Sequence, residues 1–268
     1  MFNTMLNLNR TFGIEIECFI PRACHIDSFI EICREEGLEG VTYEGYTHRI
    51  TRGWKIVTDV SICAGAGHRG IEVVSPILKG VDGLNQVQAM CRALNRVNAN
   101  VNKSCGLHVH HDAQDFASKH FDNIKEMYRR MEPELDKMMP ASRRGTRVEY
   151  VGSCIGVTNE TWEYTRYRKL NLCSYARQGT IEFRHHSGTV DAEKIVAWVH
   201  ITQAIMERAK GRKFNTTVKN RQYLFDGLKL WGFNAPSAEI KALNDTVRNY
   251  INNRQKKFGF GLQIAAAA

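Results

Sequence analysis

Three segments of the chain alternate apolar and ionisable residues with a period of two, and this pattern constrains the fold more than any other feature. They read GIEIE from residue 13, GLHVH from residue 106 and TIEFR from residue 180. In a β-strand, residues i and i+2 lie on the same face, about 6.5–7 Å apart. Each segment is therefore expected to be a strand with one apolar face and one ionisable face, which carries Glu15 and Glu17, His108 and His110, or Glu182 and Arg184.

The order of the expected elements indicates the fold class. Strands and helices are mixed without a regular alternation, so we predict an α+β fold with a largely antiparallel sheet and helices on one face. The expected strands span 10–20, 54–62, 70–78, 105–112, 168–175 and 179–186. The expected helices span 27–37, 82–102, 119–139, 191–211 and 237–255, and we expect 82–102 and 191–211 to cover the apolar face.

The ionisable face of such a sheet would be crowded with charge. Two further expected strands add Asp59 with Ser61, and Glu72. Clustered carboxylates repel one another unless cations neutralise them, and glutamate oxygens are hard ligands that suit Mg²⁺ or Mn²⁺. An arginine beside them clamps a phosphate with two hydrogen bonds. Together these residues predict phosphoryl transfer from a nucleotide.

Each motif also has a simpler interpretation. A Glu-x-Glu pair on a strand is usually solvated, and an exposed Glu182–Arg184 ion pair would contribute only about 0–1 kcal/mol. The sequence contains neither a GxxxxGK[ST] loop nor a GxGxxG motif after a strand. A nucleotide would therefore bind on the carboxylate-lined sheet.

Composition limits the setting and the partners. The chain has 268 residues, a hydrophobic fraction of 43% and a formal net charge of +9, which favours acidic partners such as nucleotide phosphates or nucleic acid. It contains no apolar run of membrane-spanning length and no signal-peptide pattern, so we expect a cytoplasmic protein without membrane contact. Its 8 cysteines form no CxxC pair and are expected to be free thiols. The compact size also suits a phage or mobile-element gene.

The motifs resemble those of a known family. FGIEIE, TDVSI, GIEVVSPIL, SCGLHVH and then LNL with GTIEFR occur in an order and spacing similar to the amidoligase family. That family belongs to the carboxylate–amine ligase superfamily, with glutamine synthetase and glutamate–cysteine ligase. The resemblance extends over about residues 10–210.

The resemblance implies an enzyme and a fold. It implies an ATP-dependent ligase, with Mg²⁺ or Mn²⁺, that phosphorylates a carboxylate and lets an amine attack the acyl phosphate. It implies a curved antiparallel sheet, like the catalytic domain of glutamine synthetase, whose concave face binds Mg·ATP. Residues 1–211 would form this catalytic domain, and residues 212–264 a basic, mainly helical extension packed on it. The partners would be ATP, a carboxylate and an amine that the sequence does not identify.

The resemblance also implies roles for individual residues. Arg184 would act on the transferring phosphoryl group, and Glu72 would be a further acidic ligand. Asp59 or Glu72 would accept the proton of the amine, although the family's usual Asp-Gly-Ser is Asp-Val-Ser here. His185 and His186 receive no role beyond contact with phosphate or substrate. The remaining assignments are metal binding by Glu15, Glu17, Glu182 and His108, phosphate binding by His110 and Arg184, and substrate binding by Asp59, Ser61, Arg143 and Arg144.

Alternative functions remain open at the level of the sequence. A metal-dependent hydrolase would use His108, His110 and the glutamates, and tight zinc binding would favour it over a ligase. A basic nucleic-acid-binding protein would use the positive segment from Lys210 to Lys257. A ligase whose acceptor is a nucleic acid or another polyanion would combine two of these functions. The basic loop at 140–147, which contains Arg143 and Arg144, is either a substrate loop or a plain surface loop.

Overall fold

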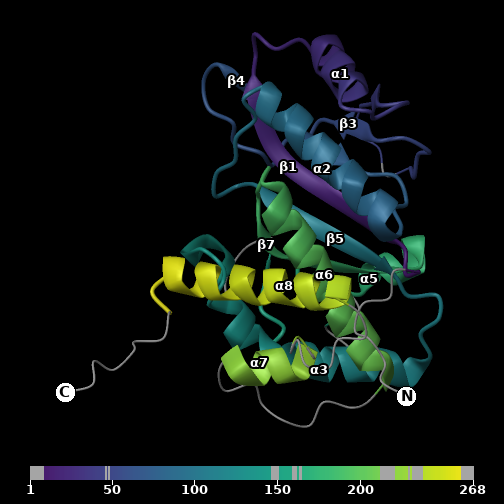
Figure 1. Cartoon of the computed structure of the whole chain (residues 1–268), viewed down its shortest axis with the longest axis vertical. Helices are drawn as coiled ribbons and strands as arrows, with labels where there is room; N and C mark the ends of the chain where they lie inside the picture. Colours follow the sequence, from purple (N-terminus) through teal and green to yellow (C-terminus); the bar gives the residue numbers. More distant parts are fainter. Residues whose placement is uncertain are drawn as a thin grey trace.

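A seven-stranded sheet forms the centre of the molecule. The structure is a computed structural model that describes residues 9–45, 47, 49–145, 151–158, 162, 165–211, 221–228, 230 and 238–260. The strand order is β2-β3-β4-β1-β5-β7-β6, and every pair is antiparallel except β2 with β3 (Figure 1). The predicted α+β class with a largely antiparallel sheet is confirmed.

The strands follow the alternation seen in the sequence. On β1, Ile14, Ile16 and Cys18 are fully buried on one face, while Glu15 lies on the other. β1 lies in the middle of the sheet, between β4 and β5. The strands are β1 (Phe12–Pro21), β2 (Thr42–Tyr43), β3 (Lys55–Val57), β4 (His68–Val74), β5 (Gly106–Asp112), β6 (Leu170–Asn171) and β7 (Thr180–Ser187).

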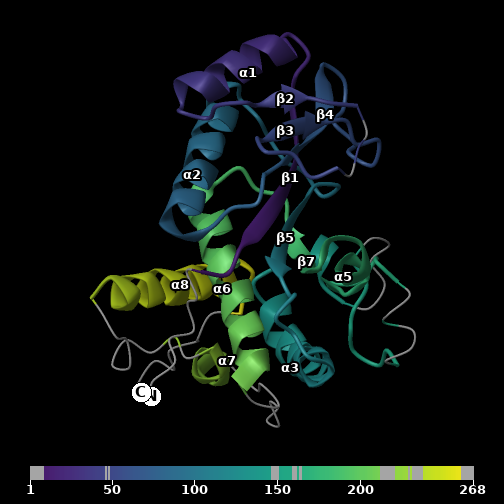
Figure 2. The ribbon, with the colours of Figure 1, turned by 90° about the vertical axis from the view of Figure 1, so that its right-hand side faces the viewer.

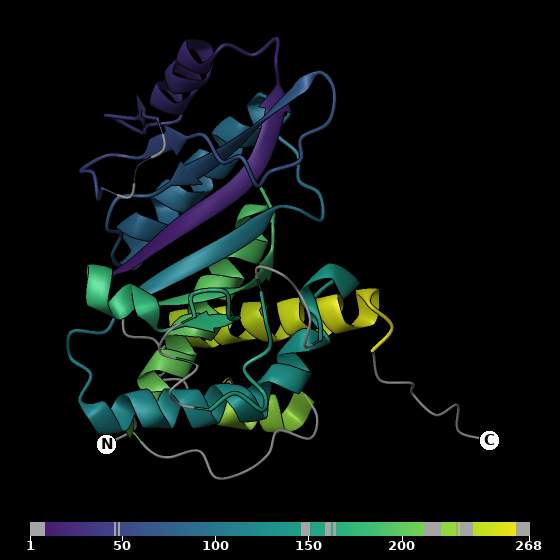
Figure 3. The ribbon, with the colours of Figure 1, turned by 180° about the vertical axis from the view of Figure 1, so that it is seen from behind.

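Helices cover the apolar face of the sheet. As predicted, α2 and α6 lie along one side of the strands, and α1 extends this layer (Figure 2). Seen from behind in Figure 3, the purple β1 and the teal β5 face the viewer, and α2 lies behind them. The helices are α1 (Ile26–Glu35), α2 (Gly80–Arg96), α3 (Ser118–Asp136), α5 (Cys173–Gln178), α6 (Ala192–Gly211), α7 (Arg221–Leu228) and α8 (Ala238–Lys257), with a 3₁₀ helix η1 (Ala141–Arg143).

Two predicted strands are much shorter than expected. The strand expected at 54–62 ends at Val57, because the Asp59 carboxylate accepts a hydrogen bond from the backbone N–H of Ser61 at 2.7 Å and stabilises a turn. The strand expected at 168–175 consists only of β6. The chain then enters α5, which ends at Gly179 with a left-handed φ of +69°.

The C-terminal helix packs on the rest of the fold. Arg254 of α8 donates to the carbonyl of Met138 just after α3, and Gln255 donates to the side chain of Glu134. Tyr250 contacts His186 on β7. The predicted division between residues 211 and 212 stays a prediction, since residues 212–220 and 231–237 lie outside the described residues.

Two expectations from composition can be compared with the structure. The eight cysteines are free thiols, as predicted, and five of them are buried: Cys18, Cys33, Cys91, Cys105 and Cys154. Among the described helices, none is both long enough and apolar enough to cross a membrane.

The central position of β1 predicts a large effect of a core mutation. Ile16 is 0% exposed between the sheet and the helices, so Ile16→Ala should lower the free energy of unfolding by about 2–5 kcal/mol. Val81→Ala, at an exposed position in the first turn of α2, should change it by less than about 0.5 kcal/mol. Urea denaturation of both variants measures the difference, and equal losses would contradict the placement of β1 at the core.

Candidate functional site

The strand register brings the ionisable residues of β1, β4, β5 and β7 onto one face. Residues directly opposite one another in an antiparallel pair point to the same face. The structure pairs three such couples across neighbouring strands, namely Glu17 with Glu72, Glu15 with His108, and His110 with Glu182. Side chains far apart in the sequence therefore meet on the face opposite the helices.

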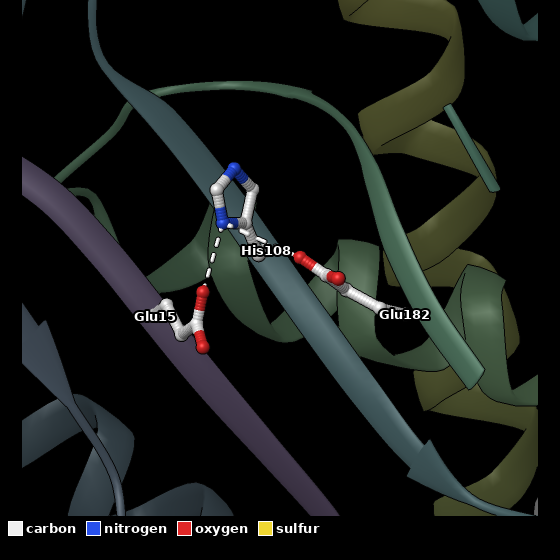
Figure 4. Close-up of side chains that lie close together, drawn as sticks. All are labelled: Glu15, His108 and Glu182. Carbon is white, nitrogen blue, oxygen red and sulfur yellow. Dashed lines mark hydrogen bonds and ion pairs between the residues drawn. The ribbon is translucent and has the colours of Figure 1, made fainter. Parts of the chain in front are cut away.

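Glu15, His108 and Glu182 form the first cluster of potential metal ligands. Nδ1 of His108 lies 2.9 Å from a carboxylate oxygen of Glu15 and 3.6 Å from one of Glu182 (Figure 4). One ligand atom from each residue lies within 4.8 Å of the others. Two carboxylates and one imidazole at this spacing can hold one divalent cation.

Glu17, Glu72 and His108 form a second cluster with the same spacing. Nε2 of His108 lies 3.6 Å from a carboxylate oxygen of Glu17, so the two ring nitrogens of His108 face different clusters. The backbone N–H of Gly106 donates to Glu17 and fixes this carboxylate at the start of β5. His108 thus stands between two adjacent candidate metal sites, both built from glutamate and histidine.

A bulge between β5 and β7 selects which side chains of β7 reach this face. The register shifts between Leu107 and Val109, and two residues of β7, Arg184 and His185, lie opposite His108. After the shift, His186 lies opposite Leu107 and is fully buried on the core side. The period-two alternation that the sequence predicts for Glu182 and Arg184 therefore does not continue to His186, because the bulge interrupts it.

The glutamates of the two clusters differ in how readily they ionise. Burial raises the pKa of Glu72, and the carboxylates of Glu15, Glu17 and Asp59 raise it further, well above the usual value. Burial also opposes ionisation of Glu15, but the imidazoles of His108 and His110 outweigh it and hold the pKa of Glu15 well below the usual value. A bound cation would offset this repulsion and lower the pKa of Glu72 again.

His110 lies beside the first cluster. Burial lowers the pKa of this imidazole, but the carboxylates of Glu182 and Glu15 outweigh that effect and raise it above the usual value. Its Nδ1 contacts the hydroxyl of Thr180 at 3.1 Å. Its Nε2 is buried 3.4 Å from Glu15, without a well-directed hydrogen bond among the described residues. A buried ring nitrogen without a hydrogen-bond partner is expected where a bound ligand would supply that partner.

Two arginines contribute positive charge. Arg184 donates to Glu182 at 2.6 Å, and the two side chains are only 15% and 6% exposed. The expectation of an exposed pair was wrong, because both residues point into the crowded face rather than to bulk water. Arg143 is buried, donates to the carbonyl of Cys105 at 2.6 Å, and is close enough to Arg184 for the two charges to interact.

The other predicted substrate residues are arranged differently. Asp59 lies in the turn after β3, and its charge acts on Glu72. Ser61 is exposed, and its backbone N–H donates to Asp59. Arg144 stacks 5.0 Å from the ring centre of Phe260, so its guanidinium contacts the C-terminal segment. Residues 146–150 of the predicted basic loop lie outside the described residues.

The structure adds one residue that the sequence reasoning did not select. The amide of Asn171 on β6 donates to the second carboxylate oxygen of Glu182 at 2.5 Å. Asn171 and Arg184 together hold Glu182 between β6 and β5. Asn171 belongs to the LNL motif, but the sequence alone does not show that it contacts Glu182. That contact follows from the pairing of β6 with β7, which places the two residues opposite each other.

A pocket opens beside the carboxylate clusters. It has a volume of about 280 Å³ and lies at the end of the sheet where β1 and β7 begin. Glu15, Glu72 and His110 belong both to its wall and to the charged face. Apolar residues of the wall include Phe12, Ile14, Ile50, Val74, Pro76 and Ile77, and the rest of the wall is mainly polar, with Arg49, Lys55 and Asp112 among it.

Comparisons with known proteins give the family. The family model described as "Putative amidoligase enzyme" matches residues 8–155 and 157–206. A search of the curated proteins found no match. The match covers well over half of the chain. The chain belongs to the amidoligase family, and the resemblance seen in its motifs is confirmed.

Solved structures show distant likenesses. The ligase PafA in complex with the prokaryotic ubiquitin-like protein Pup has 12% identity and a TM-score of 0.48, over 94% of this chain and 64% of that one. This chain therefore spans less than two thirds of PafA. A glutamine synthase homologue has 12% identity and a TM-score of 0.45, with 94% and 68% covered. GmaS in complex with ADP has 10% identity and a TM-score of 0.43, with 96% and 71% covered.

Crowding of the carboxylates predicts that Glu72 destabilises the metal-free protein. The pKa of Glu72 is raised in the folded state, so stability falls as the pH rises through that value. Glu72→Gln keeps the shape and removes the charge, and should raise the melting temperature in chelator above neutral pH. The gain should shrink toward pH 5, where wild-type Glu72 carries its proton.

Glu36→Gln is the opposite control for this measurement. Hydrogen bonds from Arg92 and Arg96 lower the pKa of Glu36, so its loss should slightly lower the melting temperature at neutral pH. Thermal denaturation between about pH 5 and 9 compares both variants with the wild type. An unchanged or lower melting temperature for Glu72→Gln at high pH would show that the carboxylates do not repel one another.

Proposed function

We propose that this chain is an ATP- and Mg²⁺-dependent ligase that joins a carboxylate to an amine through an acyl phosphate. The observation that carries the proposal is the meeting of two carboxylate–imidazole clusters and Arg184 on one face of the sheet. Family membership supplies the class of reaction. Residues 1–211 are assigned to the catalytic domain and residues 212–264 to the extension.

The ligand set fits two divalent cations. Glu15, His108 and Glu182 would hold one, and Glu17, Glu72 and His108 face the other. Glutamate oxygens favour Mg²⁺ or Mn²⁺, which would draw negative charge away from the triphosphate. The raised pKa of Glu72 supports this fit, because the cluster carries more negative charge than its histidines and arginines offset. Among the described residues each cluster supplies two carboxylates and one imidazole, a harder ligand set than the His₃ or His₂Glu of catalytic zinc sites, which favours Mg²⁺ over zinc hydrolysis.

The pocket and the clusters together would hold the nucleotide. The apolar wall at Phe12, Val74 and Ile77 fits the base, because ligand pockets are lined mostly by apolar side chains. Glu15 and His110 lie on the side of the pocket that joins the charged face. The triphosphate would therefore run from the pocket toward His110 and the metal clusters.

Arg184 would act on the transferring phosphoryl group. In this step a carboxylate oxygen of the substrate attacks the γ-phosphorus, the bond to the β,γ-bridging oxygen breaks, and ADP leaves. Negative charge gathers on the equatorial phosphoryl oxygens, and a guanidinium can donate two hydrogen bonds to them. Arg143 lies close enough to Arg184 to steady the substrate carboxylate or the same oxygens.

The amine step needs a base beside the acyl phosphate. The amine nitrogen attacks the acyl carbon, the bond to the phosphate oxygen breaks, phosphate leaves, and a proton passes to the base. Asp59 and Glu72 interact at the edge of the second cluster, so either carboxylate can accept this proton. Ser61 follows Asp59 in the same exposed turn and would contact the amine substrate. The net charge of +9 favours an anionic acceptor, and nucleic acid is one such polyanion.

ATP binding is expected to depend on a hard divalent cation. Calorimetry should detect ATP binding with Mg²⁺ or Mn²⁺, and little with zinc alone or in excess chelator. Because the pKa of Glu72 is raised in the empty site and a bound cation would lower it, binding of Mg²⁺ should release protons and become tighter as the pH rises. Titrations in two buffers of different ionisation enthalpy measure this release. ATP binding that is unaffected by chelator contradicts the metal assignment.

Variants of β7 separate metal binding from phosphoryl transfer. Glu182→Gln should nearly abolish ADP release and weaken its dependence on Mg²⁺. Arg184→Lys should lower the rate of ADP release about 10²-fold, with a much smaller effect on ATP binding, because the contact strengthens in the transition state. ADP release from Mg·ATP with pooled carboxylates and amines is the assay.

Arg96→Lys is the matched control for Arg184→Lys. Arg96 pairs with Glu35 and Glu36 on the surface of α2, and its replacement should leave ADP release unchanged. Because the Glu182–Arg184 pair is buried, both β7 variants should also lose some stability. Assays are therefore run well below the melting temperature of each variant. A loss of stability with intact turnover would make the pair purely structural.

A further inference from the structure

One carboxylate outside the metal clusters connects the segments that carry both arginines. Asp136 is the last residue of α3. One of its oxygens lies 2.5 Å from Nζ of Lys169 and 2.6 Å from Nε2 of His185. Its other oxygen accepts a hydrogen bond from the backbone N–H of Gly145 at 3.3 Å. A single side chain therefore links three chain segments.

Each of these three contacts adjoins an arginine of the site. His185 follows Arg184 directly on β7. The backbone carbonyl of Lys169 accepts the N–H of Arg184 at 2.8 Å. Gly145 lies two residues after Arg143, and its φ of +87° turns the chain in a way that residues with a side chain rarely adopt.

The network around Asp136 is buried and its charges are paired. Lys169 and His185 are both 0% exposed. Tyr128 also lies in the interior, 2.9 Å from Nδ1 of His185. Burial lowers the pKa of His185, which favours a neutral ring, and a neutral ring with its proton on Nε2 can donate to Asp136 and accept from Tyr128 at Nδ1. Burial opposes ionisation of Asp136, but His185 and Lys169 outweigh it and lower the pKa of Asp136, so it is a carboxylate.

The two arginines need such a restraint. Arg143 and Arg184 are close enough for their charges to interact, and like charges repel. The proposed reaction requires both guanidinium groups to converge on one phosphoryl group and its acceptor. Neither side chain contacts Asp136, so the restraint acts through the backbone of their own segments.

We propose that Asp136 is a positioning residue that fixes the backbone beside Arg143 and Arg184, so that both guanidinium groups converge on the transferring phosphoryl group. This inference rests on the proposed ligase function. Asp136 touches no reacting atom. It acts through Gly145 on one side and through His185 and Lys169 on the other.

Glu132 offers a matched control one helical turn earlier on α3. It is 1% exposed and contacts the same ammonium group of Lys169 at 2.9 Å. Its other oxygen accepts the backbone N–H of Cys154 at 2.8 Å. Glu132 thus shares the lysine contact of Asp136, although it is more deeply buried (1% against 18% exposed), and none of its hydrogen bonds or ion pairs among the described residues involves His185 or Gly145.

The experiment compares Asp136→Asn with Glu132→Gln. Each change replaces one acceptor oxygen by an N–H₂ group, so neither side chain can accept hydrogen bonds on both sides. Both variants should lower the melting temperature, because Lys169 loses one charged partner. Hydrogen exchange is measured in the segments 141–145 and 182–186. ADP release from Mg·ATP is measured with pooled carboxylates and amines, well below either melting temperature.

The two variants should differ in the hydrogen exchange of the segments that carry Arg143 and Arg184, and in the rate of ADP release. Asp136→Asn should speed hydrogen exchange in both segments and lower the maximal rate of ADP release about 10²-fold, with the half-saturating Mg·ATP concentration unchanged. Glu132→Gln should change neither the exchange nor the rate. Unchanged exchange in Asp136→Asn, or equal loss of turnover in both variants, overturns the inference. Wild-type protein that binds no Mg·ATP overturns the proposed function instead.

Discussion

Mutual repulsion of the carboxylates on the open sheet face governs the rest of the structure. The register of four strands, β1, β4, β5 and β7, brings four carboxylates together, those of Glu15, Glu17, Glu72 and Glu182. As long as the strands keep this register, the carboxylates cannot move apart. The imidazole of His108 and the guanidinium of Arg184 offset part of the charge, and the raised pKa of Glu72 shows that part remains. The apolar face held by the helices must supply the stability that this face lacks.

Much of this arrangement is predictable from periodicity alone. The alternation in β1, β5 and β7 identifies which side chains share a face, because that depends only on the geometry of a strand. Turn chemistry limits the prediction. Asp59 ends its strand by hydrogen bonding to the backbone of Ser61, and short polar segments give no strong signal for such turns. The bulge at Leu107 could not be foreseen either, because it depends on how two distant strands pair, and it buries His186.

Burial is the second property that the sequence pattern does not reveal. The sequence leaves open whether Glu182 and Arg184 form a solvated pair or part of a site, but it does not show that Glu182 also receives the amide of Asn171 from β6 and is largely excluded from water. Lys169 is fully buried although lysine is rarely so, and only its contacts with Glu132 and Asp136 make this tolerable. These pairings join residues 11 to 37 positions apart on different elements, and a single sequence without its fold holds no record of them.

The packing of α8 has a consequence for the order in which the protein matures. Arg254 holds the carbonyl of Met138, and Phe258 lies 5.6 Å from the guanidinium of Arg144, beside the loop that carries Arg143. Translation makes α3, β7 and α6 before it makes these residues. A nascent chain can therefore assemble the sheet and both carboxylate clusters on the ribosome, while the arginine loop gains its last contacts only after α8 has emerged. Completion of the charged face therefore follows the synthesis of α8, after the strands that carry the clusters have been made.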